Sequence, residues 1–596
     1  MVAVLLCMVM LFFVSCNSDT TPTDSTSGTT TPSTDESELP ESDESELPES
    51  DEPEFPENGA EKIIPLTKKL YVSSEQSEDI LVAHYESTPE ILLIDMDTVI
   101  TEFFGGLLAE NATYVCEEDE TTLIIERDNG AYCIIDFVED SLYFNNFDLF
   151  LASRSNAMAD ILAFPYVDSE GNSIYFQNTS SSDISGHAMF IYLAERDIPL
   201  DIYEGKKYIP FQTFNDIFLS PFGYNFVYNS KDLFLAAGGS VNPTLEEEYY
   251  SLEPTEKSQA LAEFTVNELC LLLDVFYGLQ SEHGVVAEFD VFLKHAGLWD
   301  DLISTDASKS SAALLSLAYG YLADQHSTLN KASPYSGTPN PDMSSVTMDE
   351  SFKNYIMYSG KIAAARAQIM SEGVAMYQEI GNTAYVTFDS FTLDVALRST
   401  DYSEQSKEIV DTIGLIIYAH SMITRENSPI ENVVLDLSCN GGGAADAAVY
   451  VVAWMLGYCN LHFTNPVTNS YSTATYKVDV NLDGVFDEKD SIADKNLFCL
   501  ISPVSFSCGN LVPSLLKESG RVTLLGGTSG GGACTVQHVS TADGSLFQIS
   551  SPRHLCVVSN GAYYTIDRGV EPHHYFGKFE SYFDRTALTE YINGLK

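Results

Sequence analysis

The chain has 596 residues, 44% of them hydrophobic, and a formal net charge of −58. This length exceeds what one hydrophobic core normally serves, so several domains are expected. The strongly acidic balance, without a basic stripe anywhere, argues against nucleic acid or anionic surfaces as partners.

The chain opens with an apolar run at 2–14, which is too short to span a membrane as a helix. It leads into Phe13-Val14-Ser15-Cys16, which resembles a bacterial lipobox. The resemblance implies that residues 1–16 are a lipoprotein signal peptide, cleaved before Cys16, with a lipid on the Cys16 thiol. An ordinary cleaved signal peptide is the alternative. We therefore expect a protein of the bacterial cell envelope, exposed outside the cytoplasm and touching the membrane through its N-terminal lipid only.

Residues 17–60 are expected to form a disordered acidic tether. The stretch 17–58 holds 14 Asp and Glu residues and no Lys or Arg, and the octapeptide DESELPES at 35–42 recurs at 43–50. Too few apolar groups are present to offset the cost of ordering the backbone, and like charges and prolines keep such a segment extended.

Residues 61–240 are rich in predicted strands and poor in motifs. Aromatic and β-branched runs predict strands at 91–94, 122–126, 131–137, 173–177 and 224–228. The runs at 207–211 and 222–226 are similar to the stalk-like modules at the N-termini of copper amine oxidases. An echo between 145–151 and 229–235 favours two such modules. We expect this strand-rich α+β region to be a spacer or binding module.

The chain has 11 cysteines, of which nine remain beyond Cys7 and Cys16. This number is odd, so at least one free thiol is expected. Cys116 and Cys133 flank a hairpin-like stretch and are candidates for a disulfide. The alternative is that the cysteines are small buried residues.

A helical subdomain is expected over 241–345. Helical spacing at 261–277 and 311–324 predicts two helices, and His326 lies just beyond the second. Only 57 residues separate His326 from the next clear strand, predicted at 384–388.

Two strand–turn–helix units follow, 65 residues apart. Strands at 433–437 and 497–501 run into small-residue turns and then into helices predicted at 444–456 and 509–519. Such turns direct backbone N–H groups outward at a helix N-terminus, where they can hold negative charge. We predict that Ser507 is a nucleophile and that an oxyanion hole is formed by backbone N–H groups of Gly441, Gly442, Gly443, Cys508 and Gly509.

One further motif lies upstream of these units, at 322–327. Three more follow Ser507 in order, at 526–532, 542–545 and 567–572. Their order resembles the S41 peptidases, which include the C-terminal processing proteases, the tricorn core protease and the retinoid-binding repeats. The resemblance implies an α/β fold with a crotonase/ClpP-like ββα catalytic core over 346–596. It also implies the branch without a PDZ domain, because the 57 residues between His326 and the next predicted strand are too few to hold one.

The resemblance also bears on the general base. Only Lys517, Lys578 and Lys596 follow Ser507, and none stands where the processing proteases place theirs. Asp324-Gln325-His326-Ser327 matches the string that supplies a histidine in tricorn-like members, which implies His326 as base. His538 and His554 are the competitors, nearer in sequence but outside any matched motif.

A carboxylate should orient the base, and the family places it within 566–572. Asp567 and Glu571 are both open as this acid. The sequence departs from the family pattern at His573, where Asp is usual, and at Ser438, where Arg is frequent. The second departure concerns binding of a substrate carboxylate.

The segment 479–490 fits a twelve-residue calcium loop, with Gly484 at the sixth position. Its predicted ligands are Asp479, Asn481, Asp483, Asp487 and Asp490. We expect a structural Ca²⁺ near the rim of the active site and no cofactor for catalysis. The alternative is a solvated acidic hairpin tip.

Three functions are open to such a chain. The leading one is a surface lipoprotein serine endopeptidase acting on a peptide or protein. The alternatives are a catalytically weak S41-fold protein that binds a peptide or another ligand, and a serine hydrolase acting on an ester. The presence of Ser507, His326 and an acid favours an enzyme. The sequence gives no indication of the oligomeric state.

Overall fold

The computed structural model describes residues 61–73, 75–110, 112–152, 161–163, 166–182, 186–399, 402 and 407–595. The signal peptide with Cys16 and the acidic tether both lie outside the described residues. Within the described ranges, no helix combines the length and apolar character needed to cross a bilayer.

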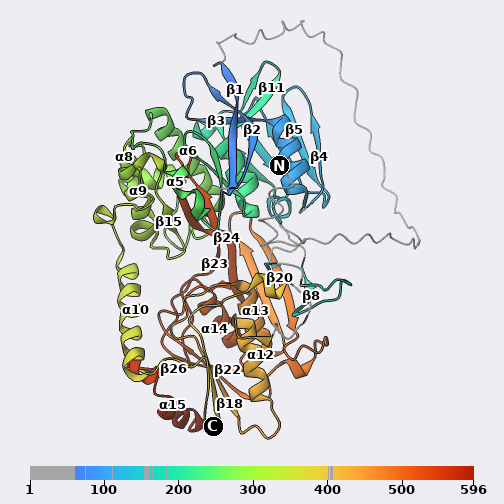
Figure 1. The fold of residues 1–596 in the computed structure, drawn as a ribbon, viewed down its shortest axis with the longest axis vertical. Coiled ribbons are helices and arrows are strands. Elements are labelled where there is room, and N and C mark those ends of the chain that lie inside the picture. Colours follow the sequence, from blue (N-terminus) through green and yellow to red (C-terminus); the bar gives the residue numbers. More distant parts are fainter. Residues whose placement is uncertain are drawn as a thin grey trace, which may run out of the picture.

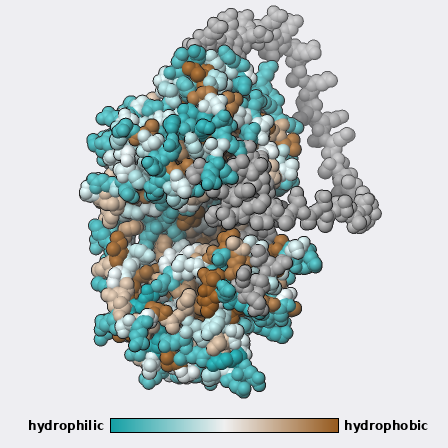
Figure 2. Space-filling view, viewed as in Figure 1, coloured by the Kyte–Doolittle hydropathy of each residue, from teal (hydrophilic) through white to brown (hydrophobic). Residues whose placement is uncertain are grey.

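The molecule is elongated and has two halves (Figure 1). We call 61–152 with 186–345 the N-terminal half, at the top of the view, and 161–182 with 346–595 the C-terminal half. On the face shown in Figure 2, apolar patches gather over the lower part, whereas hydrophilic residues cover most of the upper part.

Two sheets build the N-terminal half. Strands such as β5 and β6 place buried residues at alternate positions, as half-buried strands do. The first sheet has the order β10-β11-β3-β2-β1-β13-β12, with β14 added to β13. The second has the order β4-β5-β6-β7-β9. The strands are β1 (Ile63–Ser73), β2 (Gln76–Tyr85), β3 (Leu92–Asp95), β4 (Tyr114–Glu118), β5 (Thr122–Arg127), β6 (Tyr132–Asp136), β7 (Ser141–Phe144), β9 (Met189–Tyr192), β10 (Asp201–Tyr203), β11 (Lys206–Pro210), β12 (Asn225–Tyr228), β13 (Leu233–Ala237) and β14 (Ser240–Val241).

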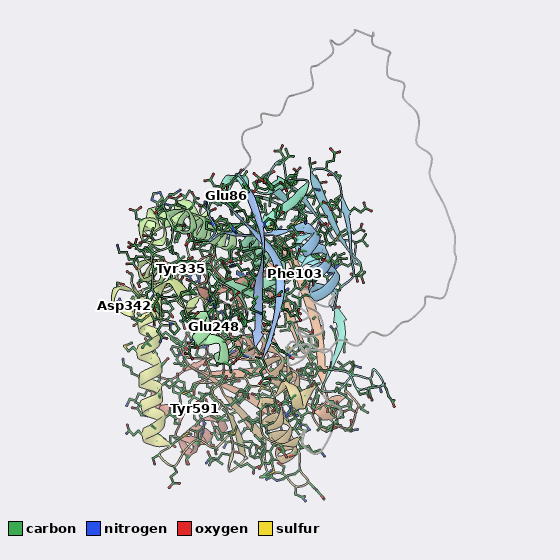
Figure 3. The ribbon with its side chains drawn as sticks, turned by 45° about the horizontal axis from the view of Figure 1, so that its top comes forward. Glu86, Phe103, Glu248, Tyr335, Asp342 and Tyr591 are labelled. Carbon is green, nitrogen blue, oxygen red and sulfur yellow. The ribbon has the colours of Figure 1, made fainter. Side chains whose placement is uncertain are left out.

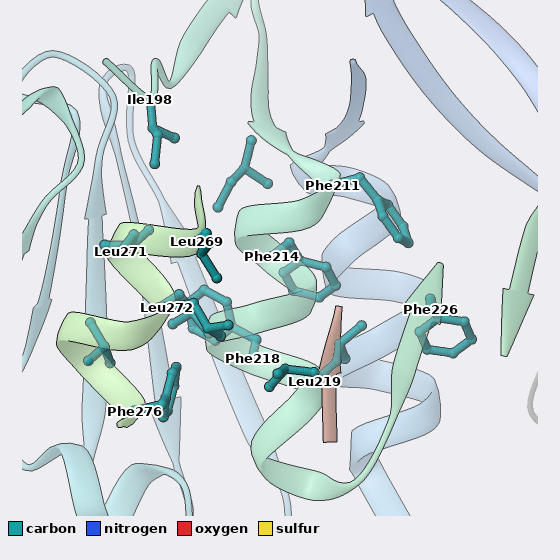
Figure 4. Close-up of a cluster of buried hydrophobic side chains, with 14 of the residues drawn as sticks. Ile198, Phe211, Phe214, Phe218, Leu219, Phe226, Leu269, Leu271, Leu272 and Phe276 are labelled. Atoms are coloured by element: carbon teal, nitrogen blue, oxygen red, sulfur yellow. The ribbon is translucent and has the colours of Figure 1, made fainter. Parts of the chain in front are cut away.

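The helices of this half pack on the same hydrophobic core as its strands. Phe214 and Phe218, which follow β11, lie in one cluster with Leu269, Leu272 and Phe276 of α6 (Figure 4). This core contains residues from both sides of the predicted boundary at residue 240. The predicted strand-rich and helical regions therefore share one hydrophobic core. The longest helix of this half is α6 (Gln259–Phe276). The others are α2 (Met96–Thr98), α3 (Phe147–Phe150), α4 (Phe211–Phe214), α5 (Glu246–Tyr249), α7 (Phe289–Ala296), α8 (Trp299–Leu302) and α9 (Ala307–Ser316), which continues into the helical turns of η7 (Leu317–Leu322).

Cys116 and Cys133, the candidate disulfide pair, are both free thiols, so the alternative of unpaired cysteines holds here. Cys116 of β4 and Cys133 of β6 both pair with Ile125 of β5, which lies between them. Two strand spacings amount to about 9–10 Å. This exceeds the roughly 6.8 Å that a disulfide tolerates between Cα atoms.

A six-stranded sheet forms the centre of the C-terminal half, in the order β16-β17-β18-β21-β22-β26. Val433 of β18 pairs with Leu497 of β21 in parallel register, so the two strands predicted at 433–437 and 497–501 are confirmed and lie side by side. Every residue of β17 and β18 is buried, as expected for parallel strands covered on both faces. The strands are β16 (Tyr377–Ile380), β17 (Thr383–Thr387), β18 (Asn432–Asp436), β21 (Asn496–Ile501), β22 (Val522–Gly526) and β26 (His574–Tyr575).

The helices of this half include two that follow central strands. They are α13 (Ala445–Leu456) after β18 and α14 (Cys508–Glu518) after β21, which confirms the two predicted strand–turn–helix units. The others are α11 (Val395–Arg398), α12 (Thr412–Ile423) and α15 (Arg585–Asn593). The long α10 (Glu350–Ile369) runs down one side of the molecule from the Tyr335–Asp342 region, which belongs to the N-terminal half (Figures 1 and 3).

A fourth sheet connects the two halves, in the order β15-β24-β19-β20-β8 with β23 and β25 added to β24. Phe547 and Ile549 of β24 belong to the core of the N-terminal half, whereas Leu555 of the same strand belongs to that of the C-terminal half. The strands are β8 (Phe176–Ser181), β15 (Thr328–Lys331), β19 (Cys459–Asn465), β20 (Ser470–Val478), β23 (Cys534–Ser540), β24 (Leu546–Ser559) and β25 (Ala562–Thr565). Thus β8, predicted within the strand-rich region, pairs with β20 of the C-terminal half.

Candidate active site

Ser507 stands at the sharp turn between β21 and α14. Its φ of 55° and ψ of −123° lie outside the regions that a residue with a side chain normally adopts. Two contacts hold this conformation: the Ser507 N–H donates to Gly531 O at 2.9 Å, and Ser507 O accepts from Asn510 N at 2.8 Å. Strained backbone of this kind persists only where the surrounding structure enforces it, and it concentrates at functional sites.

The glycine turn after β18 lies directly against Ser507. A Cβ added to Gly442 would come within 2.7 Å of Ser507 Cβ and 3.1 Å of Ser507 Oγ. Gly442 and Gly443 have φ values of 109° and 133°, which side chains rarely adopt. A Cβ on Gly509 would meet Asn440 O at 2.4 Å, so the two turns touch on this side as well.

The predicted oxyanion donors differ in whether their N–H groups are already used. The Gly441 N–H donates to Asp389 O at 3.1 Å, the Gly442 N–H to Asn440 Oδ1 at 2.9 Å and the Gly509 N–H to Phe506 O at 2.8 Å. Across the described residues, the N–H groups of Gly443 and Cys508 donate to no oxygen atom. The Cys508 thiol donates to Gly443 O at 3.2 Å and so joins the two turns. The geometry therefore leaves Gly443 and Cys508 for a developing negative charge.

A third glycine turn, within 526–532, lies between Ser507 and the predicted acid. A Cβ on Gly531 would lie 1.8 Å from Asp567 O, and the Gly532 N–H donates to the same oxygen at 3.3 Å. Because Gly531 O accepts from Ser507 N, this turn fixes the distance between the Asp567 loop and the serine turn.

His326 is buried next to the serine turn. Its ring lies against Phe506, with 4.7 Å between ring centroids, and its Cε1 would be 3.1 Å from a Cβ on Gly532. The loop is held by Asp324, whose Oδ1 accepts from His326 N at 2.9 Å. In the described part of the chain, neither ring nitrogen has a hydrogen-bond partner.

The pKa of His326 is lowered by burial, and the carboxylates of Asp324 and Asp567 offset only part of this effect. The imidazole is therefore neutral near pH 7, as a general base must be. The structure thus brings His326 beside the turn that carries Ser507, without a hydrogen bond to Ser507.

Of the two predicted acids, Asp567 is the one placed near the base. Asp567 is close enough to raise the pKa of His326, and its Oδ1 accepts from Ala533 N at 3.2 Å. Glu571 is exposed, and its main-chain oxygen accepts from Lys517 Nζ at 2.8 Å. The geometry favours Asp567 as the acid and leaves Lys517 outside the site.

Sequence reasoning missed a third group, His283. Its Nε2 lies 3.4 Å from Asp567 Oδ2, so this carboxylate contacts His283 rather than His326. His283 lies in the turn after α6, far from every motif, and the sequence around it carries no signal that could have identified it.

The two competing histidines are placed elsewhere. His538 packs against the Gly239 turn of the N-terminal half, where a Cβ would meet His538 Nδ1 at 2.7 Å. His554 is buried opposite Cys534 in the β23–β24 pair. Burial lowers the pKa of His554, while Glu282 and Asp567 raise it in part. His554 is thus near Asp567 but is not brought to Ser507 by any contact in the described ranges.

A cavity of about 300 Å³ borders the glycine turn. Asp389 and Ser390 line it and also bind the turn, since Asp389 O accepts from Gly441 N and Ser390 Oγ donates to Gly442 O at 3.1 Å. Arg366 lines the same cavity and forms a two-pronged ion pair with Asp389, at 2.6 and 2.7 Å. Four apolar side chains on the cavity wall are between 37% and 51% exposed: Val374, Met376, Ile409 and Val410.

The predicted calcium loop folds around its first and last aspartates. Asp479 Oδ2 accepts from Gly484 N at 2.7 Å, and Asp490 Oδ1 accepts from Val480 N at 2.8 Å. Burial raises the pKa of Asp490 to about 6, and Asp479 adds to the shift. Across the described ranges, no three His, Cys, Asp or Glu side chains are grouped to hold a metal ion, and calcium binding stays a prediction.

We expect Ca²⁺ at millimolar concentration to raise the melting temperature at pH 7.5, and Asp483→Ala to remove that rise. The rise should shrink at pH 5, because protonation of Asp490 competes with the cation once the pH falls below its pKa of about 6. Asp168→Ala, which removes a partly exposed aspartate outside the loop, is the control. If Ca²⁺ does not change the melting temperature of the wild-type protein, the loop is an acidic turn that does not bind calcium.

Comparison with known proteins gives three kinds of match. Residues 382–576 match the family model described as peptidase family S41. A Chlamydia pneumoniae protein named CPj1016/CpB1054 is 33% identical over 103 residues, 17% of this chain. The alignment spans 16% of that relative's length.

Among solved structures, the photosystem II D1 C-terminal processing protease is similar at 19% identity over 35% of this chain and 46% of its own, with a TM-score of 0.24. Mature CPAF is similar at 12% identity over 56% and 96%, with a TM-score of 0.35. The tricorn protease is similar at 14% identity over 39% and 19%, with a TM-score of 0.23.

Proposed function

We propose that the protein is a serine endopeptidase of peptidase family S41 with Ser507 as nucleophile, since residues 382–576 match that family's model. The observation that carries the proposal is the approach of Gly442 to Ser507, which sets the uncommitted N–H groups of Gly443 and Cys508 beside a strained serine. His326 is the general base and Asp567 its acidic partner.

In the first half of the reaction, Ser507 Oγ attacks the scissile carbonyl carbon and His326 takes the hydroxyl proton. The carbonyl oxygen becomes an oxyanion held by the N–H groups of Gly443 and Cys508, each contributing about 3 kcal/mol. Collapse of this intermediate breaks the C–N bond, and His326 gives its proton to the leaving amine. Water, deprotonated by His326, then releases the acyl group from Ser507.

The free ring nitrogens of His326 support this role. Neither has a protein partner in the described ranges, so no hydrogen bond has to break before the ring engages Ser507. The Asp324 carboxylate, which binds the backbone of the same loop, keeps the histidine beside Phe506 and the serine turn. A neutral, desolvated imidazole accepts a proton without first losing a hydration shell.

We expect a fluorophosphonate probe to label the purified wild-type protein and to leave Ser507→Ala unlabelled. His326→Ala should be labelled about a thousandfold more slowly, because the groups of such a site act as a unit. Ser519→Ala, at the other end of α14, is the control and should match the wild type. A wild-type protein that stays inert would favour the alternative of a peptide- or ligand-binding protein.

We also propose that the cavity beside the glycine turn takes an apolar side chain of the substrate next to the scissile bond. Four of its wall side chains are apolar and partly exposed, and two other lining residues, Asp389 and Ser390, bind the glycine turn. Arg366 carries its charge into the same cavity but is bound by Asp389, so a substrate carboxylate would have to displace that ion pair.

Val410→Trp should fill the cavity and raise KM for peptides with Leu or Phe beside the cut bond by about tenfold or more. Val410 is 51% exposed, so the change should leave folding intact. Val138→Trp is the matched control, since Val138 is 58% exposed and lies in the N-terminal half. Equal KM values for the two variants would show that substrate side chains bind elsewhere.

The location of the protein is part of the proposal. The apolar run, Cys16 and the acidic tether support a lipid-anchored protein held away from a bacterial membrane. Mass spectrometry of the mature protein should find a lipid-modified Cys16 at its N-terminus, and Cys16→Ala should release the protein from the membrane fraction. An unmodified N-terminus downstream of Cys16 would show an ordinary signal peptide instead.

A further inference from the structure

His283 lies between two oxygen acceptors. Its Nδ1 faces the carbonyl oxygen of Leu322, and its Nε2 lies 3.4 Å from Asp567 Oδ2. A neutral imidazole has one N–H and one acceptor nitrogen, so it can satisfy only one of these oxygens. Both are satisfied only when both ring nitrogens carry protons, which makes the side chain a cation.

The two oxygens belong to the loops that carry the proposed base and acid. Leu322 ends the helical turns of η7, where Ala323 adopts a φ of 51° and the chain turns toward Asp324 and His326. Asp567 follows β25 and anchors the Gly531–Gly532 turn. His283 therefore connects the His326 loop, from the N-terminal half, to the Asp567 loop, from the C-terminal half.

The turn that presents His283 is itself fixed. Gly278 N donates to Ser550 O of β24 at 2.9 Å, and a Cβ on Gly278 would lie 2.2 Å from Ser551 O. Within the turn, His283 N donates to Leu279 O at 3.0 Å. The turn that carries His283 is therefore bound to β24, the strand whose residues belong to both cores.

The charges around His283 favour its protonated form. Burial lowers its pKa, but Asp567 and Asp324 outweigh burial, so that the pKa lies above its ordinary value. His554 on β24 is a second imidazole near Asp567. Burial lowers the pKa of His554, and Asp567 offsets part of this effect. Tyr277 at the end of α6 and Cys534 on β23 also face these aspartates, and burial raises the pKa of both, which keeps them neutral.

We propose that His283 is a positioning residue of the active site: as an imidazolium it holds the Asp567 carboxylate and the His326 loop together across the two halves of the molecule. The proposal rests on the proposed function for the roles of His326 and Asp567. His283 itself touches neither the nucleophile nor the base in the described contacts.

The two histidines must then titrate in opposite senses. His326 works only when neutral, so activity falls as the pH drops through its lowered pKa. His283 works only when protonated, so activity falls as the pH rises through its raised pKa. The result is a bell-shaped pH profile in which the alkaline limb belongs to His283.

The test compares wild type with His283→Gln, whose amide can donate hydrogen bonds but carries no charge at any pH. The rates of fluorophosphonate labelling and of peptide turnover are measured from about pH 5 to about pH 10. His283→Gln should be about 10- to 100-fold slower, keep the acid limb and lose the alkaline limb. His84→Gln is the matched control, because His84 Nδ1 also contacts a carbonyl oxygen, Tyr85 O at 2.7 Å, in the N-terminal half.

A second measurement does not depend on activity. In protein labelled with ¹⁵N-histidine, the His283 ring should titrate above the ordinary histidine pKa in the wild type and lower in Asp567→Asn. If it does so and the wild type is nevertheless inert toward the probe and peptides, the peptidase assignment fails and the His283 contact stands. If His283 titrates identically in both proteins, or if His283→Gln keeps the wild-type alkaline limb, the positioning role is overturned. Should His283→Gln fail to fold, the titration in the two remaining proteins decides.

Discussion

The close approach of three glycine turns is the constraint on which the rest of this site depends. A Cβ would come within 2.7 Å of Ser507 at Gly442, 2.4 Å of Asn440 O at Gly509 and 1.8 Å of Asp567 O at Gly531. Parallel pairing of β18 with β21 brings the first two turns to one edge of the sheet, and β22 leads to the third. Backbone amides can surround the serine only because no side chains separate these turns.

The central fold and the nucleophile turn could be predicted because their signals are local. The apolar runs that became β18 and β21, and the small residues after them, are contiguous in the sequence. The crotonase-like core implied by the resemblance places these strands next to each other, and the structure pairs them in parallel. The choice of Asp567 over Glu571 required the structure. These two carboxylates lie four positions apart in one loop, and they differ in exposure but not in chemistry.

Other features could not be predicted, because they depend on pairing between distant segments. Strand β8 pairs with β20 through residues almost 300 positions apart, and no local pattern specifies that partner. Cys116 and Cys133 resembled a disulfide pair because the sequence does not show that β5 lies between them. His283 gains its importance only from Leu322 and Asp567, neither of which is close to it in the chain.

The proposed base, His326, lies in the N-terminal half of the molecule, and the proposed nucleophile, Ser507, lies in the C-terminal half. Ser507 and the glycine turn lie within the segment 382–576 that matches the family, whereas His326 precedes that segment. In evolutionary terms, the proposed nucleophile, its proposed amide donors and Asp567 belong to one continuous block of sequence that matches the family. The histidine belongs to a separate segment, which a lineage could replace by another proton acceptor without altering the serine turn. Descent of the block therefore does not guarantee descent of the base.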